Sequence, residues 1–222
     1  MKKDKIKILY VHGLNSNGGS RTATELKRLL KVGAIVYSPD FSNELESFSE
    51  MKKNIDKAWE FIKSERIDLV IGSSMGGFVA SKICGVTKIL INPCLRPSEQ
   101  LPRTKNISDA ELKKYAEFER EREILLDMED RLITYGLFSS NDELFSYKDL
   151  FDKLFLAAHS YTINDAHRIS TTNIKNELLK LIESSIANTE ELSKGFEKFE
   201  ETMIDDDDND NDMIVQKDIE IT

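Results

Sequence analysis

The stretch LVIGSSMGGFV, residues 69–79, decides the fold because an apolar run ends directly in a turn rich in glycine and serine. Within it, residues 72–76 (GSSMG) match the pattern G-x-S-x-G with Ser74 at the centre. This pattern is typical of a strand that turns sharply into a helix, where small residues two before and two after the serine relieve steric crowding. Ser73 fails the same test, because bulky residues occupy those two positions around it. The stretch therefore predicts a buried strand, a tight turn that exposes Ser74, and a helix.

Similar apolar runs alternate with helical patterns along the chain. The runs are nearly continuously apolar, which is typical of parallel strands covered on both faces. The clearest helical pattern is residues 45–65, where apolar residues recur at three- and four-residue spacing. This alternation predicts an α/β-hydrolase-like, doubly wound and mostly parallel sheet of about six strands, with sites at the carboxyl ends of the strands. The predicted strands are residues 6–11, 34–38, 69–72, 88–92, 132–138 and 155–163.

Residues 99–130 interrupt this rhythm with a charge-rich helical segment that contains no strand. Ser108 and Glu111 match a capping box, so a helix is expected from about residue 108. The segment is either an ordinary crossover helix or a lid folded over the carboxyl edge of the sheet. We favour the lid, because the segment follows a strand whose end should face the site.

The C-terminal end differs in composition from the rest of the chain. After a helical stretch expected over residues 172–203, residues 203–222 hold eight acidic residues against one lysine, a net charge of −7. That leaves −2 of the total charge of −9 for residues 1–202. We therefore expect one domain over residues 1–202 and a disordered acidic tail over 203–222, which is a candidate binding segment for a protein partner.

Composition excludes several functional classes. The nearly neutral body has no basic stripe, so nucleic-acid binding has no electrostatic support. No apolar run approaches the ~20 residues of a membrane span, and the start of the chain lacks the features of a signal peptide, so we expect a cytoplasmic protein. Cys84 and Cys94 are expected to be free thiols. Residues 15–20 (NSNGGS) match no nucleotide-binding loop, and no metal-ligand spacing occurs, so we expect neither a cofactor nor a metal.

A serine nucleophile needs a base, and hydrolases of this class carry the base after the acid in the order Ser, Asp or Glu, His. Only three histidines are available. His12 precedes the serine, and His159 lies inside the last predicted strand, where its ring is expected to be satisfied. His167 follows that strand in a loop, where a base can lean over the edge of the sheet, so it is the favoured base over His159.

The acid should lie in the loop after the preceding strand, where Asp142 and Glu143 stand side by side. Asp142 is favoured, because it falls in the first turn of the loop and an apolar residue follows shortly after. Glu143 is the reserve, and the alternative role for Asp142 is an ordinary turn or helix-capping residue.

The developing oxyanion needs two N–H donors. The N–H of Met75, directly after the nucleophile, is one candidate. The loop after the first strand, residues 11–20 (VHGLNSNGGS), supplies the other: Gly13 allows close approach, so Leu14 N–H is the second candidate. His12 is expected to shape this loop.

Taken in order, the motifs YVHGLNSN, IGSSMGGFVAS, INPCLRPSEQL, NDEL and DAHR resemble the small bacterial esterases of the YqiA type, in the α/β-hydrolase superfamily. The resemblance covers about residues 6–170. It implies hydrolysis of carboxylic esters or thioesters, small-molecule substrates and a catalytic triad of Ser74, Asp142 and His167. Arg96 falls in the NPxxRP stretch, where it either binds an acidic substrate group or, as we favour, pins the lid through a carboxylate. The alternatives are a catalytically idle binding protein and a lipase, amidase or acyltransferase on the same fold.

Overall fold

The computed structural model describes residues 5–124 and 126–210. Its centre is a six-stranded sheet in the order β2-β1-β3-β4-β5-β6, and every neighbouring pair runs parallel. This confirms the predicted α/β class, in which the carboxyl ends of all the strands meet at one edge of the sheet. The strands are β1 (Ile6–Val11), β2 (Ala34–Tyr37), β3 (Leu69–Ser73), β4 (Thr87–Ile91), β5 (Thr134–Ser139) and β6 (Ser160–Ile163).

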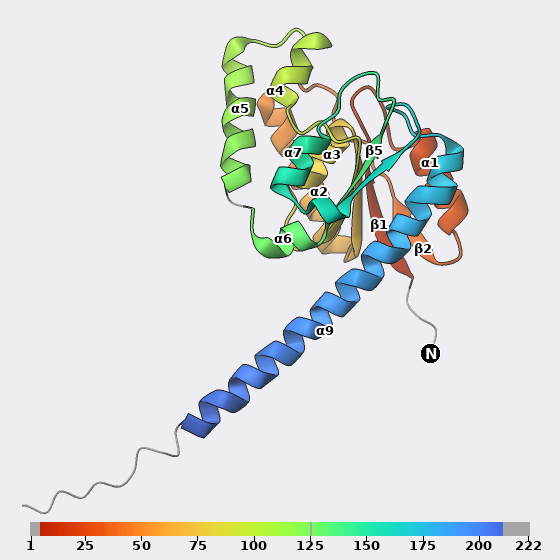
Figure 1. Cartoon of the computed structure of the whole chain (residues 1–222). Coiled ribbons are helices and arrows are strands. Elements are labelled where there is room, and N and C mark those ends of the chain that lie inside the picture. The colour runs from red at the N-terminus through yellow and green to blue at the C-terminus, as the bar shows by residue number, and fades with distance from the viewer. Residues whose placement is uncertain (1–4, 125, 211–222) are drawn as a thin grey trace, which may run out of the picture. The chain divides into compact units, whose positions relative to one another are not determined.

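Helices cover both faces of the sheet (Figure 1). The helices α2, α3 and α7 lie on one side of the strands and α1 lies on the other, where it also contacts η3. Because both faces are covered, the strands can be apolar on both, which is the pattern in their sequences. The α-helices are α1 (Arg21–Leu30), α2 (Phe48–Glu65), α3 (Met75–Ser81), α4 (Pro97–Gln100), α5 (Asp109–Ile124), α6 (Met128–Leu132), α7 (Lys148–Leu154), α8 (Thr171–Asn173) and α9 (Leu179–Asp210). The short 3₁₀ helices are η1 (Leu101–Arg103) and η2 (Ala157–His159), and η3 (Ile174–Leu178) is a π-helix.

The last strand is shorter than predicted. Residues 155–163 were expected to form it, but β6 begins only at Ser160 and His159 belongs to the turn η2. The reason is that Phe155, 5% exposed, caps the end of α7 and packs in the core. The apolar residues at the start of that run therefore serve helix packing rather than a strand.

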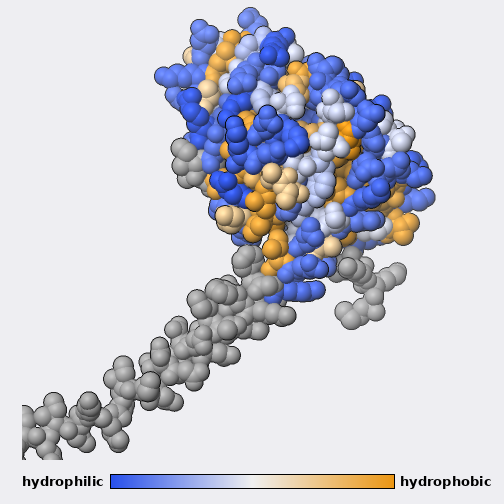
Figure 2. All heavy atoms as spheres, viewed as in Figure 1, coloured by the Kyte–Doolittle hydropathy of each residue, from blue (hydrophilic) through white to orange (hydrophobic). Residues whose placement is uncertain are grey.

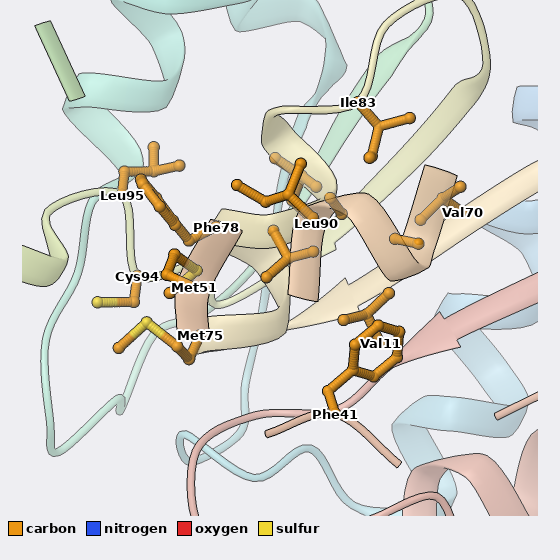
Figure 3. Packing of buried hydrophobic residues seen from close by; sticks show 14 of the residues in the cluster. Val11, Phe41, Met51, Val70, Met75, Phe78, Ile83, Leu90, Cys94 and Leu95 are labelled. Atoms are coloured by element: carbon orange, nitrogen blue, oxygen red, sulfur yellow. The ribbon is translucent and has the colours of Figure 1, made fainter. Parts of the chain in front are cut away.

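The helix α3 lies at the centre of the hydrophobic core. All of its residues, Met75 to Ser81, are buried, and Met75 and Phe78 pack in the same cluster as Val11 of β1 and Cys94 after β4 (Figure 3). Core packing thus fixes the first turn of α3, which is the turn that carries the candidate nucleophile.

Hydrophilic residues predominate on the face drawn in Figure 2, and hydrophobic residues form smaller areas between them.

The helix α5 occupies half of the segment expected to be a lid or a crossover. Tyr115 is fully buried, and its hydroxyl donates to the carbonyl oxygen of Leu45 at 3.0 Å. Glu111 accepts from the N–H of Phe48 at 2.6 Å, and Ser108 caps the helix by accepting from the N–H of Glu111. Only half of the predicted capping box therefore forms, because the Glu111 carboxylate binds the start of α2 instead of Ser108. These contacts pack α5 against α2 as a crossover helix does.

The chain forms two compact units, residues 1–185 and 186–222. The sheet lies in the first, and the helix α9 continues into the second as far as Asp210. It thus extends past the expected end at residue 203 and through the first acidic residues, because an established helix gains one hydrogen bond for each residue added. Residues 211–222 of the expected disordered tail lie outside the described residues. In the part of the chain that the structure describes, no helix has both the length and the apolar character of a membrane span.

Candidate active site

Ser74 occupies the sharp turn between β3 and α3. Its backbone adopts φ 55° and ψ −118°, a conformation that residues other than glycine rarely adopt and that clusters at functional sites. Gly76 permits this turn, because a Cβ there would lie 2.2 Å from the carbonyl oxygen of Val11. The strained turn presents Ser74 to a cavity at the carboxyl edge of the sheet.

Three side chains that are distant in the sequence meet at this edge. Ser74 Oγ lies 3.0 Å from His167 Nε2, and His167 Nδ1 lies 2.7 Å from Asp142 Oδ2. Asp142 comes from the loop after β5 and His167 from the loop after β6. The side chains of His167 and Asp142 are only 8% and 3% exposed. The arrangement can move a proton from the serine hydroxyl to the imidazole.

Hydrogen bonds keep Asp142 ionised. Burial by itself would raise the pKa of this carboxyl, but donation from the His167 ring and from the N–H groups of Leu144 and Phe145 outweighs it and holds the pKa below its usual range. A carboxylate at this position favours the His167 tautomer with its proton on Nδ1. The Nε2 atom is then free to accept from Ser74 Oγ.

The adjacent acid, Glu143, binds a different part of the same histidine. Its Oε2 accepts from the main-chain N–H of His167 at 2.9 Å, and this bond is the largest cause of the lowered pKa of Glu143. Of the two acids that the sequence offered, the structure places Asp142 against the ring and Glu143 against the backbone.

Asn92, which the sequence analysis did not single out, ties the His167 loop to the sheet. It follows β4, is 3% exposed and has a positive φ of 41°. Its Oδ1 accepts from Ser139 N–H at 2.7 Å, and its Nδ2 donates to Ser139 Oγ and to the carbonyl oxygen of His167, both at 2.9 Å. Two signals were available: its place directly after a buried strand, in a residue type that tolerates positive φ, and its position as the first residue of the NPxxRP stretch.

The two candidate oxyanion donors both line the cavity. Leu14 lies in the loop after β1, and Met75 is the first residue of α3. Within the described residues, neither main-chain N–H donates to a protein acceptor. The loop carrying Leu14 runs close to the nucleophile, because a Cβ on Gly13 would lie 3.1 Å from Ser74 Cβ. Both N–H groups are therefore available to a ligand beside Ser74.

The other two histidines have different surroundings. His12 Nε2 accepts from Phe41 N–H at 2.9 Å and its Nδ1 donates to the Gly13 carbonyl oxygen, so its ring holds the loop in shape as expected. His159 stacks on Tyr135 with ring centroids 4.3 Å apart. It does not line the cavity, and its buried Nδ1 has no hydrogen-bond partner in the described part of the chain, contrary to the expected satisfied ring. Neither ring is placed to act on Ser74.

Ser73, the rejected neighbour, has a separate partner. It lines the cavity together with buried Tyr10, and burial raises the pKa of Tyr10 although nearby hydroxyls, that of Ser73 among them, lower it. Ser73 therefore helps to build the cavity wall, through a side-chain contact instead of the backbone contact that a turn residue usually makes.

The cavity beside Ser74 has a volume of about 770 Å³. Its walls come from the loop after β1, the start of α1, the turn at Ser74 between β3 and α3, the loop after β5 and the His167 loop. Of the segment 99–130, Gln100, Arg103 and Thr104 line it, and no described residue of α5 does. Among the described residues, no group of three His, Cys, Asp or Glu side chains could hold a metal ion.

Arg96 does not line the cavity. Its guanidinium pairs with the carboxylate of Glu123 on α5. On the same helix, Glu119 accepts from both the N–H and the hydroxyl of Ser98 at 2.8 Å. Of the two roles considered for Arg96, the observed contact matches a pin between the NPxxRP stretch and the helical segment.

Comparisons with known proteins identify the family and the fold. A family model described as "Uncharacterised protein family (UPF0227)" matches residues 7–186. Among curated protein sequences, none matches this chain at a significant level.

Solved structures share the fold at low sequence identity. Est1E from Butyrivibrio proteoclasticus has a TM-score of 0.62 at 11% identity, with 82% of this chain and 89% of that chain covered. Tomato methylketone synthase I, in complex with beta-ketoheptanoate, has a TM-score of 0.53 at 11% identity, with 85% and 99% covered. An epoxide hydrolase from metagenomes of hot environments has a TM-score of 0.53 at 10% identity, with 82% and 91% covered. At these identities the likeness shows the α/β-hydrolase fold.

Proposed function

We propose that this chain, which belongs to the YqiA-like family UPF0227 and has the α/β-hydrolase fold, is a serine hydrolase that cleaves carboxylic esters or thioesters. The observation that carries the proposal is the hydrogen-bonded series from Ser74 through His167 to Asp142, with separations of 3.0 and 2.7 Å. Along the chain the three residues occur in the order nucleophile, acid, base, which is the order found in hydrolases with this fold. Acyl transfer also requires donors that stabilise the oxyanion, and the N–H groups of Leu14 and Met75 line the cavity beside the strained Ser74.

The acylation step follows from these contacts. Ser74 Oγ attacks the carbonyl carbon of the ester while its proton passes to His167 Nε2. The carbonyl oxygen becomes an oxyanion, which the N–H groups of Leu14 and Met75 stabilise. When the tetrahedral intermediate collapses, the bond to the alcohol or thiol breaks, and the leaving group takes the proton from His167.

Deacylation repeats the same steps with water. His167 Nε2 removes a proton from water, the hydroxyl adds to the acyl carbon, and Ser74 Oγ leaves with the proton that His167 returns. The free acid is the second product. Throughout, Asp142 holds the imidazole by Nδ1 and stabilises its charged form without itself taking the proton.

Two other functions of this fold are alternatives to the proposed serine hydrolase. An idle binding protein on this fold has no need of the strained serine and its aligned base, which is why we place it second. A lipase, amidase or acyltransferase would use the same residues, since the fold alone does not choose the reaction. We also place the protein in the cytoplasm, which fits two cysteines, Cys84 and Cys94, that form no disulfide with each other.

Hydrolysis of p-nitrophenyl acetate by the full chain tests the proposal. We expect turnover above background that falls by about 10³-fold or more in Ser74→Ala and in His167→Ala, since each removes one member of the series. Ser73→Ala is the matched control and should lower the rate far less. A folded protein without turnover on acetate, butyrate or octanoate esters would favour the idle binding protein.

A further inference from the structure

We infer that the ester cleaved at this site carries a negatively charged group, which Arg21, Arg103 and Arg168 bind. The inference rests on the proposed function and names the class of its substrate. It starts from the charges that line the cavity beside Ser74.

Those charges are unbalanced. The three arginines and Glu143 are the charged residues among the described lining of the cavity. The Glu143 carboxylate already accepts the main-chain N–H of His167. The cavity is therefore cationic, although residues 1–202 as a whole carry a net charge of only −2. A positive cavity in a slightly acidic body raises the local concentration of anionic substrates.

The three guanidinium groups keep N–H donors for a ligand, although Nη2 of Arg21 also donates to main-chain carbonyl oxygens. Within the described part of the chain, none of them pairs with a carboxylate, whereas Arg28 and Arg96 bind Glu25 and Glu123. All three side chains are exposed at the cavity. A guanidinium carries five N–H donors in a planar fork that suits carboxylate and phosphate oxygens.

The arginines come from three segments that converge on the cavity. Arg21 begins α1, Arg103 ends η1, and Arg168 directly follows the candidate base. Arg21 Nη2 donates to the carbonyl oxygens of Arg168 at 3.2 Å and of Ile169 at 2.7 Å, which holds Arg21 against the His167 loop. Arg21 and Arg168 thus lie in the part of the wall that also carries the base, and Arg103 lines the same cavity from η1.

The rest of the lining includes both polar and apolar side chains. Hydroxyl and amide groups of Asn15, Ser16 and Asn17 accompany the arginines, while Leu144, Phe145 and Ile169 provide an apolar surface. Such a lining suits an ester with one apolar part and one anionic part, and it disfavours a long, wholly apolar chain. Arg96, for which binding of an acidic substrate group was the less favoured of two predicted roles, pairs with Glu123 instead.

Matched neutral and anionic esters test the inference on the full chain. The pair methyl 4-acetoxybenzoate and 4-acetoxybenzoate places the charge on the alcohol side, and the pair phenyl hexanoate and monophenyl adipate places it on the acyl side. Each kcat/KM is divided by the uncatalysed rate constant of the same ester, so that intrinsic reactivity cancels. We expect the anionic member of at least one pair to be preferred roughly fivefold or more. The pair that shows the preference identifies the side of the ester that carries the charge.

Charge-removing variants connect the preference to the arginines. Arg21→Gln, Arg103→Gln and Arg168→Gln should each reduce the anionic-to-neutral ratio by roughly two- to fivefold, and the triple variant should abolish it. Arg28→Gln is the control: it lies on the same helix as Arg21 and removes the same charge outside the cavity, so the ratio should stay. Raising the salt from about 0.02 to 0.5 M should also shrink the ratio, because screening weakens attraction at an exposed site.

Two results would overturn the inference while leaving the proposed function intact. One is equal corrected rates for both members of both pairs in the wild type. The other is a preference that persists in the triple variant, provided that a fluorophosphonate still labels Ser74 in that variant. Failure of the proposed function looks different, because the wild type would then cleave neither neutral ester and Ser74 would take up no label.

Discussion

Asp142 and Glu143 follow one another in the chain, yet they bind different parts of His167. Asp142 Oδ2 contacts ring Nδ1 at 2.7 Å, and Glu143 Oε2 accepts the main-chain N–H at 2.9 Å. The first contact orients the ring and favours the tautomer with its proton on Nδ1, and the second holds the backbone of the loop. Two neighbouring acids should therefore differ sharply in their contribution to catalysis.

Replacing each acid by its amide measures this difference. Asp142→Asn should lower kcat by about 10⁴-fold, because an amide cannot stabilise the imidazolium and favours the wrong tautomer. Glu143→Gln keeps an oxygen that can accept the His167 N–H, so its kcat should fall by about tenfold at most. Steady-state kinetics on p-nitrophenyl acetate gives both values. Equal losses in the two variants would contradict the assigned roles.

Asn92 is expected to act as a positioning residue for His167. Asn92→Gly removes the side-chain bonds to Ser139 and to the His167 carbonyl oxygen, and glycine tolerates the positive φ. We expect kcat to fall by about 10²-fold while KM changes little, since a misplaced base slows chemistry more than binding.

A second substitution at this position separates catalysis from stability. Asn92→Asp keeps the acceptor for Ser139 N–H but loses the donor to His167, so its kcat should also fall. Thermal unfolding of both variants provides the control. If both variants have a lower Tm but an unchanged kcat, Asn92 only stabilises the fold and does not position His167.

Gly76 tests the packing that forms the turn at Ser74. A Cβ at this position would meet the carbonyl oxygens of Val11 and His12 at 2.2 and 2.5 Å. Gly76→Ala should therefore lower the free energy of unfolding by about 3 kcal/mol or more, because backbone atoms must move. Gly33→Ala is the matched control, since no atom lies within 4 Å of its added Cβ. Urea denaturation in which the two variants lose the same stability would refute the close approach.

Glu119 predicts a pH dependence of stability. It is 2% exposed, and burial raises its pKa even though Ser98 donates to it and Arg96 and Lys82 attract its charge. With the folded pKa above the unfolded value of about 4.3, the favourable contribution is complete below that value and is lost as the pH rises through the folded pKa. Glu119→Gln cannot ionise and keeps an acceptor for Ser98. Its Tm relative to the wild type should therefore increase between about pH 5 and pH 8, and a constant difference would argue against the raised pKa.

The fold was predictable because its signals are local. Nearly continuous apolar runs separated by helical patterns indicate a parallel sheet, and the small residues around Ser74 indicate the sharp turn from strand to helix. The order of Ser74, Asp142 and His167 along the chain also selected the three side chains that the structure brings together. Their catalytic roles, and the single domain expected over residues 1–202, stay predictions.

The remaining features depend on contacts between distant segments. Asn92 bonds to residues 47 and 75 positions away, which no local pattern reveals. The sequence likewise predicted the α5 helix and favoured a lid, whereas no described residue of α5 lines the cavity. Its composition alone does not fix its position, because a charged helix can either cover the site or pack beside it. The sequence predicted a strand from Phe155 onward, but Phe155 instead ends the helix α7 and packs in the core. The unbalanced arginines emerged only when three segments met at one cavity.

The most direct test of the account is the site of covalent labelling by a fluorophosphonate, mapped by peptide mass spectrometry on the full chain. We predict a single adduct on Ser74 of the wild-type protein, absent in Ser74→Ala and strongly slowed in His167→Ala, with labelling retained in Ser73→Ala. An adduct on Ser73, or a folded wild-type protein that takes up no label, would contradict the account.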